Sequence, residues 1–441
     1  MNVSEFYNSD YVDYACYSTL RALASSIDGQ KNSGRKILKT VLDKKIINEI
    51  KVSQLASKMA EYTEYLHGDA SGPIVTMAQN YVGTNNISLL HPEGNFGTRF
   101  KNEASAPRYI YTYGTDELFK MFNGNDKEIL VKQYFEGDEI EPKFYLPSLP
   151  VLLINGAQGP ATGFAQKILP RSEVAIEKFL IKALKSGKRS TFNLDPHYNG
   201  FLGEVRQGEE KHKWEILGVI NRKSASKVDI TELPIGYELK KYIKILDDLE
   251  DKGVITGYID KSDDNKFNFE LQFKIADLKK LTDEQLLTKL KLVNKQAENY
   301  TAIDENNKVK VFKNSDEIFW YYYDVKMNYL QKRKDFIINK ITNDIYLDVS
   351  KYIFIKAIVD EKLIINKRKK SVIEKDLEKI DKIIKKDDSY NYLLSMPIYS
   401  LTKEKLDALT KEIKDKKAKL VAIKKQTLES IWMDDLKWYY I

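Results

Sequence analysis

The sequence predicts a multidomain α+β protein, and three observations support this. Most of the glycine and proline lies in the first 175 residues, where irregular backbone is expected. The middle of the chain mixes strand and helix patterns, and from about residue 316 onward glycine is absent and proline remains only at Pro397. With 441 residues, the chain is long enough for two to four domains with large cores.

The middle and final segments supply the elements behind this prediction. The residue pattern predicts strands at 215–220 and 267–273 and an amphipathic helix between them at 238–246. The last third reads as long charged helices that break near residues 387–389 and again at Pro397.

The final helix has an apolar seam at alternating spacings of three and four, with Lys416 at one core position. Antiparallel coiled-coil packing would follow from it, and an ordinary amphipathic helix lying on a globular body is the alternative. The apolar positions of the seam are Leu406, Leu409, Ile413, Leu420 and Ile423.

Charge and cysteine content narrow the class of protein. Lys and Arg number 71 against 64 for Asp and Glu, a net charge of +7 that permits a polyanionic partner without requiring one. Cys16 is the only cysteine, so an intramolecular disulfide and a cysteine-rich zinc site are excluded and a reducing compartment fits best. The N-terminus does not resemble a signal peptide, and no window approaches eighteen uncharged apolar residues, so we expect a soluble, unsecreted protein with no membrane contact.

Motifs for nucleotides and metals are missing from the sequence. The string nearest to a P-loop, residues 187–190, lacks the upstream glycine. Three acidic pairs, at residues 263–264, 387–388 and 434–435, lie in polar turns or at helix ends without a glycine-framed strand before them. None of them predicts a magnesium site in this chain.

Alternating tyrosines at 109, 111 and 113 follow directly after Arg108. Taken alone, this period of two predicts one face of a half-buried strand, or a helix packed with bulky rings. The strings that precede it suggest a different role. These are a glycine turn with a basic cluster at 27–38, Leu-His-Gly-Asp at 66–69, Met-Ala-Gln within 74–79, and Gly-Asn-Phe-Gly within 93–98.

In order and spacing, these strings resemble the breakage-reunion subunit of type IIA DNA topoisomerases, the family that includes the A subunits of DNA gyrase and topoisomerase IV. The layout is most similar to the medium subunit of a phage-encoded topoisomerase. The resemblance covers nearly the whole chain, and its further strings lie at residues 139–142, 146–147, 152–156, 161–163 and 230–234.

The resemblance implies a domain order. We expect an N-terminal arm in contact with a partner subunit, then a winged-helix DNA-gate domain with the catalytic tyrosine, an α/β tower domain, and a long antiparallel coiled-coil arm ending in a helical dimerisation gate. Within the winged helix, residues 74–79 would be the recognition helix. The expected bounds are 1–27, 28–140, 141–315 and 316–441.

The resemblance also assigns catalytic roles. Tyr109 corresponds to the nucleophile that forms a 5′-phosphotyrosine link to DNA, which conserves the energy of the broken bond. Arg108 and Arg35 would stabilise the charge that develops on the phosphorus centre. His67 would act in proton transfer or hold the scissile phosphate.

The resemblance also implies a group of DNA-binding residues. They would contact mainly the backbone phosphates, so binding would depend steeply on salt concentration. A lysine considered singly is more often a solvated surface charge, and only the motif context favours phosphate binding here. Pro160 stands where the family has an isoleucine that wedges between base pairs, so bending of the DNA would occur with altered geometry. The predicted DNA-binding residues are Lys31, Lys36, Gln79, Asn95, Arg99, Lys101, Pro160 and Arg171.

The expected partners are double-stranded DNA, a second copy of the chain, and a subunit with ATPase and TOPRIM modules that binds both ATP and Mg²⁺. On this reading the enzyme relaxes and decatenates DNA in a bacterial or phage-infected cytoplasm. Two alternatives are a non-catalytic DNA-binding scaffold derived from the same family and a tyrosine recombinase. The recombinase pattern of dispersed Arg-His-Arg with a C-terminal tyrosine does not match an Arg-Tyr pair near residue 109.

Overall fold

The computed structural model describes residues 3–122, 124–263 and 266–437. It divides into two compact units, Met1–Lys326 with Asp435–Ile441, and Met327–Asp434. Helices and strands are mixed in the first unit, and the described part of the second contains helices only. The α+β prediction is therefore confirmed at this level, whereas the four expected domain bounds stay predictions.

Three helices and a small sheet form the part of the first unit that contains the candidate site. The sheet is antiparallel in the order β1–β3–β2, and Thr112 of β3 pairs with Ile50 on one side and Pro92 on the other. Apolar side chains of the helices, such as Ile37, Leu55 and Ile74, are completely buried. The elements are α3 (Asn32–Asp43), β1 (Ile50–Lys51), α4 (Val52–Thr63), α5 (Ser71–Ala78), β2 (Leu90–Glu93) and β3 (Tyr111–Gly114).

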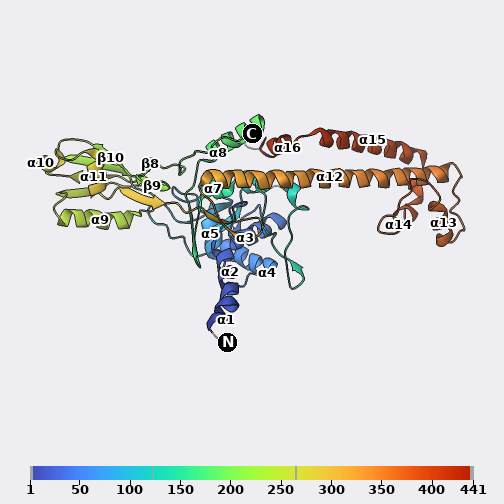
Figure 1. Cartoon of the computed structure of the whole chain (residues 1–441), viewed down its shortest axis with the longest axis horizontal. Helices are drawn as coiled ribbons and strands as arrows, with labels where there is room; N and C mark the ends of the chain where they lie inside the picture. The colour runs from blue at the N-terminus through green and yellow to red at the C-terminus, as the bar shows by residue number, and fades with distance from the viewer. Residues whose placement is uncertain (1–2, 123, 264–265, 438–441) are drawn as a thin grey trace. The chain divides into compact units, whose positions relative to one another are not determined.

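The N-terminal helices α1 and α2 lie next to this region (Figure 1), and α2 contacts both α3 and a hairpin. Gly159 lies in the hairpin β6–β7, and a Cβ there would fall 2.1 Å from the carbonyl oxygen of Ala22 at the end of α2, so only glycine fits. Gln166 of the same hairpin accepts from the amide of Ala24 at 2.8 Å. The elements are α1 (Val3–Asn8), α2 (Asp10–Ala22), α7 (Val151–Asn155), β6 (Ala157–Ala161) and β7 (Phe164–Ile168).

The first unit also contains a capped helix and several short elements. Ser172 caps α8 by accepting from the amide of Ala175, and Gly187 ends the helix in the left-handed conformation. The elements are α6 (Asp116–Met121), the 3₁₀ turn η1 (Gly124–Asp126), β4 (Tyr134–Phe135), β5 (Asp138–Glu139), α8 (Glu173–Ser186), β15 (Thr301–Ile303) and β16 (Val309–Val311).

A four-stranded antiparallel sheet, in the order β10–β11–β13–β12, contributes to an apolar cluster of the first unit. Side chains of α9, including Tyr242 and Leu246, pack with Ile230 and Phe269 of the sheet. The predicted strand at 215–220 is two strands, because Gly218 approaches the carbonyl of Glu232 so closely that a Cβ would lie 2.5 Å from it. The elements are β10 (Val219–Arg222), β11 (Lys227–Glu232), α9 (Leu239–Asp251), β12 (Gly257–Asp260), β13 (Phe269–Gln272) and α10 (Ile275–Leu278).

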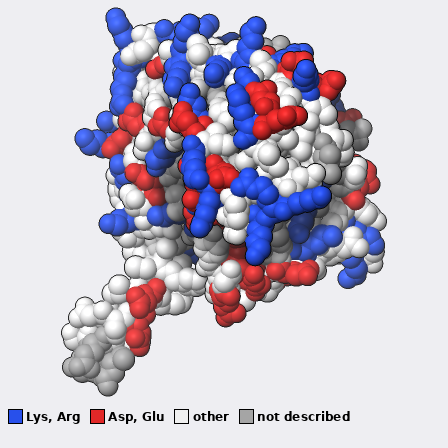
Figure 2. All heavy atoms as spheres, turned by 90° about the vertical axis from the view of Figure 1, so that its right-hand side faces the viewer, with Lys and Arg blue, Asp and Glu red and all other residues white. Residues whose placement is uncertain are grey.

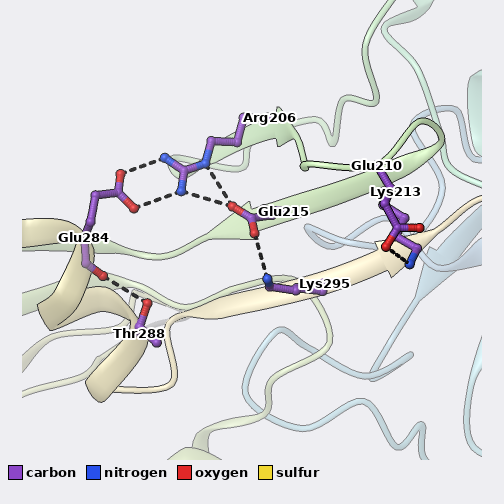
Figure 3. A network of polar contacts seen from close by, with 7 residues as sticks. All are labelled: Arg206, Glu210, Lys213, Glu215, Glu284, Thr288 and Lys295. Atoms are coloured by element: carbon purple, nitrogen blue, oxygen red, sulfur yellow. Dashed lines mark hydrogen bonds and ion pairs between the residues drawn. The ribbon is translucent and has the colours of Figure 1, made fainter.

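A neighbouring three-stranded sheet, β14–β9–β8, is tied to a helix by charged side chains (Figure 3). Arg206 donates to both carboxylate oxygens of Glu284, at 2.7 and 2.8 Å, and also to Glu215. Glu215 in turn accepts from Lys295 of the adjacent strand at 3.2 Å. The elements are β8 (Glu204–Gln207), β9 (Lys213–Leu217), α11 (Asp283–Lys289) and β14 (Val293–Ala297).

The second unit is built on two helices that run antiparallel. Lys334 donates to the carbonyl of Gln426 at 2.6 Å, Asp348 pairs with Lys416, and Phe354 packs in one apolar cluster with Leu409. Lys416, which interrupts the apolar seam in the sequence, is thus neutralised by a carboxylate of the facing helix. The elements are α12 (Ser315–Val359), α13 (Lys370–Leu377), α14 (Asn391–Leu394), η2 (Ile398–Ser400), α15 (Lys403–Lys425) and α16 (Leu428–Asp435).

Candidate nucleic-acid cleavage site

Tyr109 lies in a turn that is held at both ends. The amide of Ser53 donates to the carbonyl of Pro107 at 3.3 Å, and the amide of Val52 donates to the carbonyl of Ile110 at 3.0 Å. Ile110 is buried, whereas the side chain of Tyr109 is 66 % exposed. The strand begins only at Tyr111, so the alternation of tyrosines is not one continuous strand face. A phenol is therefore presented to solvent on a fixed backbone.

Arg108 is exposed beside this phenol. Its guanidinium carbon lies 4.7 Å from the centre of the Tyr109 ring, within the range of a cation–π contact. Five N–H donors on a planar group can bind two phosphate oxygens at once. The two neighbouring side chains thus offer a nucleophile and an anion-binding group at the same point.

His67 lies in the loop between α4 and α5. The loop is fixed on its C-terminal side by Asp69, whose carboxylate accepts from the amide of Ser71, the first residue of α5, at 2.9 Å. The imidazole Nε2 is hydrogen-bonded to the hydroxyl of Tyr17. His67 is exposed, and slight desolvation together with the positive charges of Arg21 and Lys36 lowers its pKa below the ordinary value of 6.5. His67 is therefore biased toward the neutral form, which can both donate and accept a proton.

Arg35 is 6 % exposed, which the sequence did not indicate. Its Nη1 donates to the carbonyl of Lys143 at 2.6 Å, and its Nε has no hydrogen-bond partner within the described residues. Burial raises the pKa of the neighbouring Asp28, and the charge of Arg35 opposes that rise. The catalytic role expected for Arg35 stays a prediction.

Three of the residues predicted to contact phosphates have side chains that are buried and bonded to other protein groups. Arg171 is 1 % exposed and forms a two-point ion pair with Glu298, with both N–O distances 3.0 Å. Arg99 donates to the carbonyls of Leu233, Pro234 and Tyr237 and lies 3.5 Å from Glu232.

Lys36 is the third, with its ammonium 2.9 Å from a carboxylate oxygen of Glu141 and bonded to the carbonyl of Thr63. A buried cation with a carboxylate partner is held inside the protein and is unavailable to a backbone phosphate. In this structure the three side chains hold parts of the fold together, and their expected role in DNA binding stays a prediction.

The other predicted DNA-binding residues are partly or fully exposed. Lys31 is half-buried and donates to the carbonyl of Gln158 at 2.8 Å, and burial lowers its pKa. Lys101 is exposed and lies 3.1 Å from Glu103, and Pro160 is exposed on β6. Gln79 donates to the carbonyl of Phe96 at 2.9 Å, and Asn95 accepts from the amide of Gly97 at 2.9 Å, so these two shape the loop that precedes Arg108.

The sequence analysis missed two polar residues around this site, Tyr17 and Asn86. Tyr17 contacts His67 from α2, and the only signal for it was the cluster of tyrosines in that helix. Asn86 donates to the carbonyls of Ile154 and Arg171 and thereby joins the loop before β2 to the segment around the hairpin β6–β7. No pattern in the sequence marked Asn86, because its partners are distant along the chain.

Metal-ligand clusters and membrane-spanning helices are both missing from the part of the chain that the structure describes. Within residues 3–122, 124–263 and 266–437, no group of three or more His, Cys, Asp or Glu could hold a metal ion. Of the acidic pairs, Asp264 lies outside the described residues. No described helix is long and apolar enough to cross a bilayer. Lysine and arginine are interspersed with acidic residues on the face drawn in Figure 2.

The model of the family described as the A subunit of DNA gyrase/topoisomerase IV matches residues 21–437. This chain belongs to that family. The match includes His67, Arg108 and Tyr109 as well as the whole of the second unit. Family membership thus agrees with the resemblance drawn from the sequence strings.

Relatives of this member of the gyrase/topoisomerase IV family include much longer proteins. DNA topoisomerase 2, mitochondrial, of Dictyostelium discoideum is 32% identical over 98% of this chain, which covers 34% of that protein. DNA topoisomerase 2 of Plasmodium falciparum is 31% identical, again over 98% of this chain and 34% of the relative. The chain spans about one third of the length of these relatives. Both are eukaryotic, and the expected phage or bacterial setting stays a prediction.

A solved structure shows the same fold. It is titled the DNA-binding, cleavage and re-ligation domain of Plasmodium falciparum topoisomerase II, and the TM-score is 0.84 at 32% sequence identity. The alignment covers 98% of this chain and 63% of that chain.

Proposed function

We propose that this chain is the DNA-cleaving and rejoining part of a type IIA DNA topoisomerase. The observation that carries the proposal is the exposed Tyr109 with Arg108 over its ring, on a turn anchored by Ser53 and Ile110. In this proposal the Tyr109 oxygen attacks a DNA phosphorus atom, the 3′ oxygen leaves, and a 5′-phosphotyrosine ester remains. Reversal of the same steps reseals the strand.

The neighbouring groups have defined tasks in this scheme. Arg108 binds the non-bridging phosphate oxygens, whose negative charge increases as the new bond forms. His67, held neutral, accepts a proton or donates a hydrogen bond to a phosphate oxygen. Arg35 would join them only if its buried guanidinium reaches the phosphate, and its free Nε is the donor available for that.

DNA binding in this proposal relies on the exposed part of the predicted set. Lys31 and Lys101 would contact backbone phosphates, and α5 with its three-stranded sheet would form the winged-helix element. Pro160 lies at the exposed edge of the hairpin, where an apolar wedge could enter a base step.

Other parts of the molecule would complete the enzyme. The four-stranded sheet region corresponds to the proposed tower, and the antiparallel α12–α15 pair to a coiled-coil arm ending in the dimerisation gate. Two copies would each cut one strand so that a second duplex passes, which relaxes and decatenates DNA.

ATP and Mg²⁺ would be bound by ATPase and TOPRIM modules outside this chain, in a partner subunit. The described residues of this chain do not fit a metal, so no step through a metal is derived for them. We place the protein on DNA inside the cell.

A covalent-trapping experiment tests the proposal. The chain, assembled with its ATPase and TOPRIM modules, is mixed with supercoiled DNA and Mg²⁺ and then denatured with detergent. Protein-linked linear DNA is expected with wild type and with Tyr111→Phe, and none with Tyr109→Phe. Persistence of the link in Tyr109→Phe would show that another residue is the nucleophile, and DNA binding without any link in wild type would favour the scaffold.

A further inference from the structure

Tyr17 makes a contact with the candidate site that the proposed reaction does not itself require. It lies on α2, fifty residues before His67, and its side chain is 48 % exposed. Its hydroxyl is nevertheless hydrogen-bonded to Nε2 of His67, and the two ring centres are 5.7 Å apart. A long exposed side chain held on one imidazole nitrogen restricts that imidazole.

The surroundings of His67 come from three segments. Tyr17 and Arg21 face it from α2, Lys36 contributes positive charge from α3, and Tyr65 of its own loop packs edge-on with ring centres 5.6 Å apart. The guanidinium carbon of Arg21 lies 6.0 Å from the centre of the Tyr17 ring. His67 is therefore framed by two rings and two cations.

The hydrogen bond has a chemical consequence for the proton on the imidazole. A neutral imidazole has one N–H donor and one acceptor nitrogen. A tyrosine hydroxyl that donates to Nε2 makes this nitrogen the acceptor and leaves the proton on Nδ1. Slight desolvation and the charges of Arg21 and Lys36 lower the pKa of His67, which agrees with a neutral ring.

We propose that Tyr17 is a positioning residue for His67, whose hydroxyl donates to Nε2 and fixes the neutral imidazole with its proton on Nδ1, ready to donate to a phosphate oxygen. This rests on the proposed function of His67 in DNA cleavage. Tyr17 itself does not touch the DNA in this scheme.

Nuclear magnetic resonance of histidine tests this without any DNA. The chain has four histidines, so imidazole ¹⁵N and ¹³C signals are few, and His67→Gln assigns the one of interest. Wild type should show the Nδ1–H tautomer for His67. Tyr17→Phe should change the tautomer signal and raise the pKa of His67, since a donor to the neutral form is lost. Tyr65→Phe, which alters the ring on the other side, should leave both unchanged.

DNA cleavage gives the second readout. Tyr17→Phe should slow formation of the covalent link about three- to tenfold, the effect of one hydrogen bond. It should have no further effect in a His67→Gln background, since the coupling runs through His67. Tyr134→Phe, an exposed tyrosine on β4, is the control for removing a hydroxyl elsewhere.

The outcomes separate the two proposals. An unchanged His67 tautomer and pKa in Tyr17→Phe overturns the positioning role, whatever the cleavage rate. If Tyr17→Phe changes the His67 signal but wild type forms no covalent link to DNA, the contact between Tyr17 and His67 is supported and the proposed function is overturned. Equal slowing by Tyr17→Phe with and without His67 also overturns the positioning role.

Discussion

The guanidinium of Arg108 lies over the ring of Tyr109, 4.7 Å from its centre, although both side chains are open to solvent. Cation–π attraction at an exposed site contributes only about 0.5–1 kcal/mol, which is too little to make Arg108 important for folding. The pair is better understood as two groups prepared for an anion that arrives from outside.

Arg108→Lys tests whether the shape of the guanidinium matters. Lysine keeps the charge but loses the two-point contact with phosphate oxygens, so we expect the cleavage rate to fall about 10- to 100-fold with the fold unchanged. Single-turnover formation of the covalent link measures this. Arg189→Lys, an exposed arginine near Trp320, is the matched control. A cleavage rate equal to wild type would reduce the role of Arg108 to charge alone.

The salt dependence of DNA binding should distinguish exposed from buried cations. Removing one phosphate contact lowers the slope of log affinity against log salt by about one. We expect Lys31→Ala and Lys101→Ala each to do so in a fluorescence titration of a duplex from low to moderate salt. If neither changes the slope, the DNA path lies elsewhere on the surface.

Arg171→Ala should act on stability. Its removal leaves Glu298 charged and buried without its ion-pair partner, which costs about 3–5 kcal/mol in the free energy of unfolding. Urea denaturation measures the change, and Lys101→Ala, with an exposed side chain, should leave the midpoint where it is. A stable Arg171→Ala protein with weakened DNA binding would contradict this structural role and support the predicted phosphate contact.

The ion pair between Asp348 and Lys416 predicts acid sensitivity of the second unit. Burial works against the charged form of Asp348, but Lys416 and Lys351 outweigh it, so the pKa lies below its ordinary value of 3.8. A carboxyl group whose pKa is lower in the folded state than in the unfolded state stabilises the folded protein at pH values above its unfolded-state pKa. This stabilisation is lost as the pH falls through the folded-state pKa.

Thermal melts by circular dichroism, at pH 6 and at successive pH values below 4, should therefore show that the melting temperature of wild type falls on acidification. Asp348→Asn should be less stable at pH 6 and should lose less on acidification. Parallel acid sensitivity in both proteins would assign the effect to other carboxylates.

Much of the fold could be predicted from local pattern. The helix expected at 238–246 is α9, residues Leu239–Asp251, and the strand expected at 267–273 contains β13, residues Phe269–Gln272. Apolar periodicity reports which face of an element is buried, and this property is local. The break at Gly218 was not predicted, since it depends on how closely the carbonyl of Glu232 approaches.

The candidate site was only partly predictable for the same reason. Arg108 and Tyr109 adjoin in the sequence, and the order of the motif strings by itself determined the family, which the family match confirms. The residue type alone, lysine or arginine, does not show whether the charged side chain is open to a phosphate or already bound by another protein group. Arg171 is neutralised by Glu298, 127 residues away, and Arg99 is held by the carbonyl of Leu233, 134 residues away.

The sequence alone therefore determined the family, the mixed helix and strand composition and the Arg-Tyr pair, because each can be recognised from short strings or local patterns and their order along the chain. Only the tertiary structure decided which cations are open to a phosphate and that Tyr17 contacts His67. Burial and hydrogen bonding are set by partners that folding brings from distant positions, and a buried charge is stable only where such a partner neutralises it.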